Sequence, residues 1–314
     1  MTSPVTTSLA RLDAGPIPPA DAAQWLAGHL DQIRAAVAGH GAVLVRGLGL
    51  DGRAAAGAAL RQVIGEAVTE REGFAPRDRY GDGVHSSSHW PADQPMCMHN
   101  ELSYAAQAPS LMAFACLTPP TRGGVTALAG TRAVLRGLPA ELTEPFRRDG
   151  WLLTRHFNPL VGLAWQEAFG TDDPKAVDEY AARHAIDVRW DADGGLHTRQ
   201  LRPAVVTHPG TGEDCWFNQI AFLNEWTMAP DVREFLTQEF GPEGLPFNTF
   251  HADGTPLDRE TVDLINEVYE QHTVREPWQR GDLMVVDNIR MAHSREPYQG
   301  EREILVGLGE PFRP

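Results

Sequence analysis

The feature that most constrains the fold is a series of short apolar runs after residue 110, each bounded by Gly, Pro or Asp. These runs include LMAFACL, WLLTRHF, AVVTHPG, DCWFNQIAF, DLMVVDN and EILVGLG. Runs of this length with β-branched and aromatic residues are typical of strands. Strands alternate only weakly with helices, and no glycine-rich phosphate loop follows a strand, which disfavours a parallel nucleotide-binding sheet. The pattern predicts a mainly β fold with surrounding helices, built as an antiparallel barrel or jelly roll.

The region before these runs is organised differently. Apolar residues at helical spacing predict an amphipathic helix over residues 18–39, followed by a buried strand over 41–48 and a second helix over 53–65. Residues 70–95 are polar and glycine-rich with no periodicity, as expected of an active-site loop or lid. We expect residues 1–15 to form a flexible arm and residues 16–314 a single domain.

Charge and cysteine content exclude several classes of partner. The net charge of −15 is spread along the chain, which argues against binding to nucleic acid or to an anionic membrane. The three cysteines have no C-x-x-C spacing, and no apolar run is long enough to span a bilayer. We therefore expect a cytoplasmic protein that acts on a small-molecule substrate. The sequence leaves its oligomeric state open.

His99 and Glu101 form the most informative local pattern, because side chains two positions apart on an extended strand point to the same side. His293 follows the apolar run DLMVVDN and could reach the same point from a neighbouring strand. Two histidines and one carboxylate on one face of a metal ion leave three positions open, as in non-haem Fe(II) oxygenases. The alternative interpretation makes His99 a hydrogen-bonded loop residue and Glu101 a solvated charge.

Several longer motifs occur around these residues in a characteristic order. They are PADQPMCMHNELSY, LTPPTRGGVTALAG, CWFNQ and W-x-x-GDLMVVDN-x-x-x-AHSR-x-x-x-x-G-x-R. With these motifs the chain resembles the taurine dioxygenase/clavaminate synthase-like family, and within it the branch of the syringomycin-biosynthesis aspartyl hydroxylase. The resemblance covers about residues 86–308. It implies a double-stranded β-helix core and the use of Fe(II), 2-oxoglutarate and O₂.

The resemblance also implies roles for individual residues. His99, Glu101 and His293 match the iron ligands, and Thr126 matches a threonine that binds 2-oxoglutarate. The family signature ends in two adjacent arginines, the second of which holds the distal carboxylate of 2-oxoglutarate. Here that register falls on Glu303, so Arg302 is the nearest replacement. Candidate substrate contacts are Asn100, Ser103 and Asn218.

Three functions remain open at the level of the sequence. The first is a 2-oxoglutarate-dependent oxygenase that hydroxylates an unactivated C–H bond in an amino acid, or in an amino-acid-derived intermediate of specialised metabolism. Its substrate would be free or tethered to a carrier protein. The second keeps the iron but not 2-oxoglutarate, because Glu303 would repel that anion. The third is a non-catalytic, metal-stabilised binding protein.

Overall fold

A six-stranded sheet is the largest element of the fold in the computed structural model, which describes residues 9–158 and 161–314. Its strands run in the order β1-β2-β15-β5-β18-β3. Their bounds are Ala10–Asp13 (β1), Ala42–Arg46 (β2), Leu283–Asp287 (β15), Ala108–Thr118 (β5), Glu303–Phe312 (β18) and Val84–Ser86 (β3). Only β1 and β2 pair in parallel, and the other neighbours are antiparallel.

Two four-stranded sheets complete the main framework. The first runs β14-β7-β16-β4, with bounds Thr273–Val274, Leu128–Gly130, Met291–Arg295 and Met96–His99. The second runs β13-β8-β10-β9, with bounds Phe247–His251, Trp151–Phe157, Leu196–Arg202 and Asp187–Trp190. The remaining strands form two small pairs, Val205–Thr207 (β11) with Asp214–Trp216 (β12), and Tyr298–Gln299 (β17) with Arg122–Gly123 (β6).

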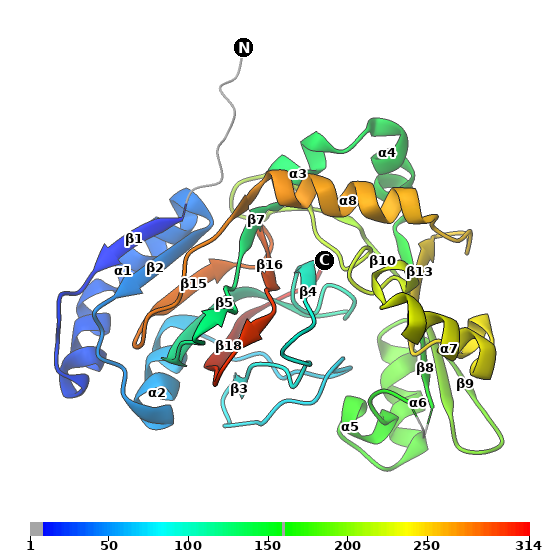
Figure 1. The fold of residues 1–314 in the computed structure, drawn as a ribbon, viewed down its shortest axis with the longest axis horizontal. Coiled ribbons are helices and arrows are strands. Elements are labelled where there is room, and N and C mark those ends of the chain that lie inside the picture. Colours follow the sequence, from blue (N-terminus) through cyan, green and yellow to red (C-terminus); the bar gives the residue numbers. More distant parts are fainter. Residues whose placement is uncertain (1–8, 159–160) are drawn as a thin grey trace.

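The helices surround these sheets, as Figure 1 shows. Their bounds are Ala22–His40 (α1), Gly52–Ile64 (α2), Thr131–Gly137 (α3), Ala140–Asp149 (α4), Trp165–Phe169 (α5), Pro174–Arg183 (α6), Pro230–Phe240 (α7) and Arg259–Gln271 (α8). The expected sheets with surrounding helices are present, but helices and strands occupy similar lengths of the described chain, so the fold is mixed and not mainly β. Among the described residues, no helix has both the length and the apolar character needed to cross a membrane.

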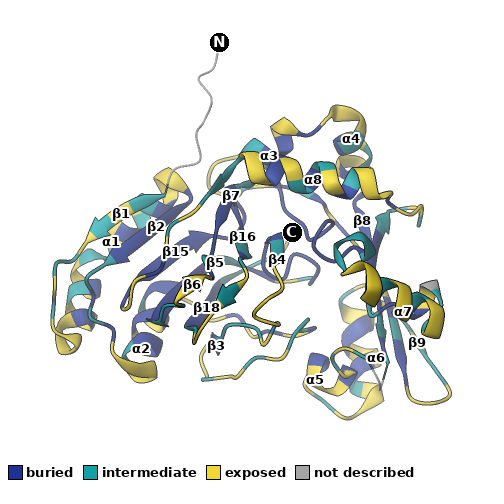
Figure 2. Cartoon of the chain, viewed as in Figure 1, coloured by how far each residue is buried: buried dark blue, intermediate teal, exposed yellow. Residues whose placement is uncertain are grey.

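The central strands are buried on both faces, and this explains their continuous apolar runs. In β5, Met112 and Phe114 belong to the core shared with the sheet β14-β7-β16-β4, whereas Ala113 and Ala115 belong to the core beneath α1 and α2. The same alternation holds in β2, β15 and β18. Figure 2 shows β2, β15 and β5 dark blue beside α1 and α2, which are yellow on their outer sides.

The amino-terminal expectation needs a correction. Residues 1–8 of the expected arm lie outside the described residues, but Ala10–Asp13 form strand β1, which pairs with β2. The segment is short and its burial alternates, so its strand character depends on the partner that only the tertiary structure supplies. The two expected helices correspond to α1 and α2, and the expected strand between them to β2.

The close contact between β18 and the end of α2 leaves no room for a side chain at Gly309, which can be tested. A Cβ atom at this position would lie 2.0 Å from the carbonyl oxygen of Ile64, a backbone atom that cannot easily move. We expect Gly309→Ala to lower the free energy of unfolding by at least about 1–3 kcal/mol. The matched control is Gly28→Ala in α1, where the added methyl group meets no atom within 4 Å. This change should stabilise the protein by about 0.5–1 kcal/mol, because alanine favours helix more than glycine does. Urea unfolding of both variants measures the difference, and equal stabilities would contradict the packing described here.

Candidate functional site

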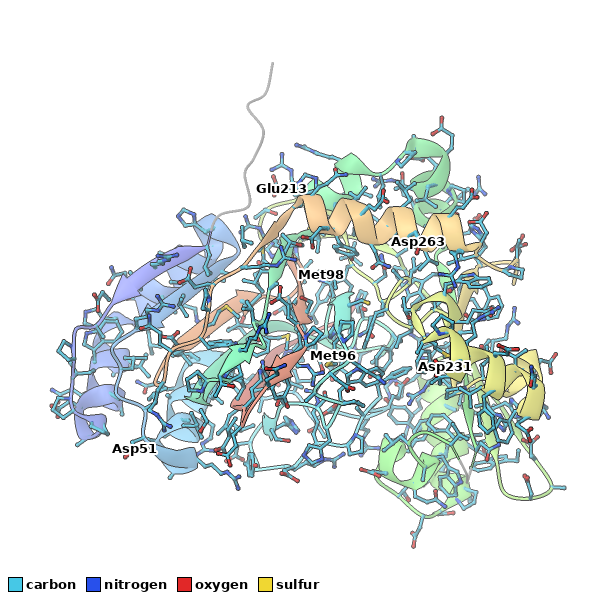
Figure 3. All side chains as sticks on the ribbon, in the orientation of Figure 1. Asp51, Met96, Met98, Glu213, Asp231 and Asp263 are labelled. Atoms are coloured by element: carbon cyan, nitrogen blue, oxygen red, sulfur yellow. The ribbon has the colours of Figure 1, made fainter. Side chains whose placement is uncertain are left out.

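Two histidines face each other across the pairing of β4 with β16. His99 is the register partner of His293, and their ring centroids lie 4.2 Å apart. The Nδ1 atom of His99 lies 2.7 Å from the carbonyl oxygen of Cys97, so this nitrogen donates and Nε2 keeps its lone pair. Figure 3 labels Met96 and Met98 on β4, the strand that leads to His99, near the centre of the molecule. The antiparallel register thus brings together two residues that are distant in the sequence.

Glu101 completes a group of three ligating side chains. Its Oε2 atom lies 3.7 Å from Nε2 of His99 and 3.6 Å from Nε2 of His293. Asn288 holds this part of the backbone, because its side chain accepts from the Glu101 N–H at 2.8 Å and donates to the Glu101 carbonyl oxygen at 3.0 Å. All three ligating residues are buried, and their ligand atoms lie within 4.8 Å of one another. The predicted cluster therefore exists in the fold.

Arg77 neutralises this buried carboxylate. Its Nη2 atom donates to Oε1 of Glu101 at 2.7 Å, so Oε2 is left facing the two histidines. Burial by itself would raise the pKa of the Glu101 carboxyl, but Arg77 and the two histidines hold that pKa well below its usual range. Burial, and then the neighbouring His99, lowers the pKa of His293 well below its ordinary value. An ionised carboxylate beside a neutral imidazole is the protonation state that a metal ion requires.

Thr126 and Arg302 lie in the cavity beside this cluster, where the sequence predicted the 2-oxoglutarate site. The Thr126 hydroxyl oxygen accepts hydrogen bonds from Nη2 of Arg302 and Nε1 of Trp278, both at 3.2 Å. With both lone pairs engaged, its own proton is available to donate to a further acceptor. Arg302 also donates from Nε to the carbonyl oxygen of Gly124 at 3.0 Å. Gly124 has a φ of +69°, and a Cβ there would lie 2.6 Å from Pro120.

The expectation that Glu303 occupies the position of the cosubstrate arginine needs a correction, because side chains alternate along the strand. Arg302, Ile304 and Val306 line the cavity, so every second residue of this segment points inward. Glu303 points the other way and pairs with Arg53, its Oε1 atom lying 2.6 Å from Nε of that residue. The pairing of β18 with β5 is also irregular between Glu303 and Ile304. The prediction that Glu303 repels the cosubstrate is therefore wrong. That repulsion was the reason to consider an oxidase that does not use 2-oxoglutarate, so this alternative loses its support.

The three expected substrate contacts lie in the protein interior, where Asn100 and Asn218 have backbone partners. Asn100 donates to the backbone carbonyl oxygen of Asn288 at 2.5 Å, and Asn218 donates to that of Ala204 at 3.1 Å. Ser103 is fully buried. None of the three is among the described residues that line the two cavities beside the cluster. Their predicted role is corrected, because each side chain points into the protein interior.

A second cavity on the other side of the cluster contains residues that the sequence did not single out. It shares Arg77, His99 and Glu101 with the first cavity. Its further lining residues include Glu70, Phe74, Trp90, Tyr104, Gln219 and Phe222. Phe222 stacks on the His99 ring at 4.6 Å between centroids. In the motif CWFNQ, Gln219 and not Asn218 faces the site, a choice that depends on the local backbone and not on the residue types.

Buried arginines fasten the two ends of the polar loop of residues 70–95, in which Phe74 packs against the core and β3 pairs with β18. Arg155 of β8 donates to the carbonyl oxygens of Glu72 and Gly73 at 2.7 and 2.8 Å. Arg295 of β16 donates to the carbonyl oxygens of Trp90, Pro91 and Gln94. The loop is thus held at both ends. Both ends of the loop therefore depend on guanidinium groups from strands that are distant in the sequence.

The fold and this site define a class of protein. The Taurine catabolism dioxygenase TauD, TfdA family matches residues 3–308, and the chain belongs to this family. It is a non-haem iron dioxygenase, and the recognition made from the motifs is confirmed. The cofactors expected from the sequence, Fe(II), 2-oxoglutarate and O₂, are those of this family.

Particular relatives are similar over most of their length. The dapdiamide synthesis protein DdaC of Enterobacter agglomerans is 31% identical over 274 residues, which cover 87% of this chain and 83% of DdaC. The clavaminate synthase-like protein At3g21360 of Arabidopsis thaliana is 27% identical over 248 residues, 75% of this chain and 71% of that protein. The crystal structure of PvcB from Pseudomonas aeruginosa has a similar fold, with a TM-score of 0.53 at 17% identity over 98% of this chain and 89% of PvcB.

Arg77 should stabilise the metal-free protein by pairing with Glu101. Removing one partner of a buried ion pair costs about 3–5 kcal/mol, so Arg77→Met should lower the free energy of unfolding by that amount. Added Mn²⁺ should recover part of the loss, because the carboxylate regains a positively charged partner. Chemical unfolding with and without Mn²⁺ measures both effects.

The controls for this test come from the same loop. Arg79→Met changes an exposed arginine two positions away and should have little effect. In the double variant Arg77→Met/Glu101→Gln the loss should be smaller than in Arg77→Met alone, because Glu101 no longer carries an unpaired charge, whereas Glu70 loses its contact with Arg77 in both variants. Equal losses in the two variants would show that Arg77 acts through packing and not through Glu101.

Proposed function

We propose that the protein is a 2-oxoglutarate-dependent hydroxylase in which His99, Glu101 and His293 bind Fe(II), while Thr126 and Arg302 bind 2-oxoglutarate. The observation that carries this assignment is the Thr126 hydroxyl, which accepts two hydrogen bonds and has its proton left to donate. A hydroxyl donor beside a guanidinium is suited to a carboxylate group. When bound, Fe(II) and 2-oxoglutarate would supply the electrons that reduce and so activate O₂, which is the oxidant of the reaction.

The fit of the metal rests on the residues present. Both histidines present Nε2 toward Oε2 of Glu101, and Arg77 occupies the other carboxylate oxygen. This arrangement favours a monodentate carboxylate and leaves part of the coordination sphere open toward the cavities. Because Glu101 is a carboxylate ligand, no metal position is freed for a halide at that point, which favours hydroxylation over halogenation.

Arg302 provides the counter-charge for the cosubstrate. Burial, and then the neighbouring Arg295, lowers the pKa of Arg302 to about 10, so its guanidinium remains charged at neutral pH. A buried cation of this kind gains from an anionic ligand, because the pair satisfies a charge that is otherwise removed from water. We infer that the distal carboxylate of 2-oxoglutarate lies against Arg302 and the Thr126 hydroxyl. In our proposal, the double-stranded β-helix core consists of the six-stranded sheet and the sheet β14-β7-β16-β4, which together enclose this cavity.

The second cavity supports an amino acid, or an intermediate derived from one, as the substrate. It carries charges of both signs, with Nε of Arg77 3.7 Å from Oε1 of Glu70. Nη1 of Arg77 is buried and has no hydrogen-bond partner among the described residues, so it is available to a substrate carboxylate. The names of DdaC and of PvcB, described as an oxygenase of an isonitrile synthetic pathway, favour a role in specialised metabolism. A free amino acid offers its α-carboxylate to Arg77, whereas a substrate tethered to a carrier protein through that group would have to offer a side-chain carboxylate.

The loop of residues 70–95 is the proposed lid. It contributes Arg77, Ser88 and Trp90 to the cavities beside the cluster. Loops that carry both a cluster contact and substrate contacts commonly close over a bound substrate. Arg155 and Arg295 anchor the two ends of the loop and β3 pairs with β18 within it, so the proposed movement is confined to the stretches between these fixed points.

The proposal predicts the loss of turnover when any of the three iron ligands is removed. His99→Ala, Glu101→Ala and His293→Ala should each abolish iron-dependent O₂ uptake and succinate release, while far-ultraviolet circular dichroism stays that of the folded protein. Asn288→Asp is a useful comparison, because it disturbs the backbone clamp on Glu101 but keeps all three ligands. Full activity in any alanine variant would remove that residue from the metal site.

A second prediction separates the two neighbouring residues at the start of β18. Arg302→Ala should raise the 2-oxoglutarate concentration required for half-maximal rate by about tenfold or more, because a charge-assisted hydrogen bond contributes about 1.5–3 kcal/mol. Thr126→Val should have a smaller effect in the same direction. Glu303→Ala, the matched control, removes only the surface pair with Arg53 and should leave that requirement unchanged. A stronger effect from Glu303 than from Arg302 would reverse the assignment.

A further inference from the structure

A second cluster of metal-ligating side chains lies in the sheet β13-β8-β10-β9, apart from the residues that line the first site. His156 on β8 is the register partner of His197 on β10, and their rings stack with centroids 3.9 Å apart. Asp191 follows β9, and its Oδ2 atom lies 2.8 Å from Nε2 of His197 and 3.4 Å from Nε2 of His156. The three ligand atoms lie within 4.8 Å of one another.

The two clusters share the same construction. In each, a histidine pair faces across antiparallel strands, and one carboxylate oxygen lies between the two Nε2 atoms. In each, an arginine holds the other carboxylate oxygen, since Nη1 of Arg189 lies 2.8 Å from Oδ1 of Asp191. The second cluster differs in being partly accessible, with side-chain exposures of 12% for His156, 20% for His197 and 24% for Asp191.

One ring nitrogen of this cluster, Nε2 of His156, has no hydrogen-bond donor among the described residues. Nδ1 of His156 lies 3.3 Å from the carbonyl oxygen of Gly244, and because a carbonyl only accepts, this nitrogen carries the proton. In the neutral ring Nε2 is then a lone pair, and it faces the carboxylate of Asp191. One proton between His197 and Asp191 satisfies only that pair. A cation that accepts lone pairs from all three atoms satisfies the whole cluster.

We propose that His156, Asp191 and His197 form a second metal site, which binds a divalent transition metal of the Zn²⁺ class. Two imidazole nitrogens and one carboxylate oxygen form a donor set that suits Zn²⁺, with water as the fourth ligand. Its ligands come from β8, from β10 and from the turn after β9, so the metal fastens the β9–β10 hairpin to β8. This metal site is independent of the proposed reaction, because none of its three ligands is among the residues assigned to that reaction.

Metal stoichiometry in the full chain tests this proposal. The double variant His99→Ala/His293→Ala removes two ligands of the first site and should still bind one equivalent of Zn²⁺, measured by isothermal titration calorimetry on metal-free protein. Adding His156→Ala or Asp191→Asn to this background should weaken the remaining binding by at least about tenfold. Zn²⁺ should raise the midpoint of thermal unfolding in the background variant and not in the triple variants. Circular dichroism of the metal-free variants checks that each is folded.

His208→Ala is the matched control in the same background. His208 also pairs with a carboxylate, its Nε2 atom lying 2.9 Å from Oδ2 of Asp287. Its Nδ1 atom accepts from the N–H groups of Gly210 and Thr211, so both ring nitrogens are engaged, and within the described part of the chain no second histidine shares the carboxylate. This variant should keep the Zn²⁺ equivalent. Absence of Zn²⁺ binding in the background variant, or binding unchanged by both His156→Ala and Asp191→Asn, would overturn the proposal.

Discussion

The antiparallel pairing of β4 with β16 is the interaction on which the site depends. It places His99 directly opposite His293, and a shift of one residue would turn one of the two rings to the other face of the sheet. Asn288 then fixes Glu101 against the end of the same strand pair through its backbone. Strand pairing and the Asn288 side chain thus bring His293 together with His99 and Glu101, which are distant from it in the sequence.

Alternation along the large sheet assigns a function to each of its faces. The inward residues of β18 line the cavity proposed to bind 2-oxoglutarate, whereas the outward residue Leu305 packs beneath α1 and α2. Because neighbouring residues point in opposite directions, Arg302 and Glu303 have entirely different surroundings. The acidic residue is harmless to an anionic cosubstrate for this reason. The departure from the family signature is thus a change at the surface of the protein and not in its cavity.

Buried arginines supply most of the organising charge around the site in a chain that is acidic overall. Arg77 pairs with the carboxylate of the ligand cluster, and Arg302 lies beside Thr126. Arg155 and Arg295 bind backbone carbonyl oxygens at the two ends of the 70–95 loop. A guanidinium can do both because its donors form a planar fork that reaches several oxygens at once. The loop position and the charge state of Glu101 are coupled through Arg77, which belongs to the first and contacts the second.

The sequence by itself determined the ligand types, the family and the central strands. These conclusions rest on local features: the spacing of His99 and Glu101, the run before His293 and the continuous apolar segments. Local features can be recognised without knowledge of the fold. Only the tertiary structure decided that Arg302 faces the cavity, that Asn100 and Asn218 serve the backbone, and that Arg77 reaches Glu101. The physical reason is that side-chain direction and pairing depend on strand register and on partners distant in the chain. Residue type alone carries neither.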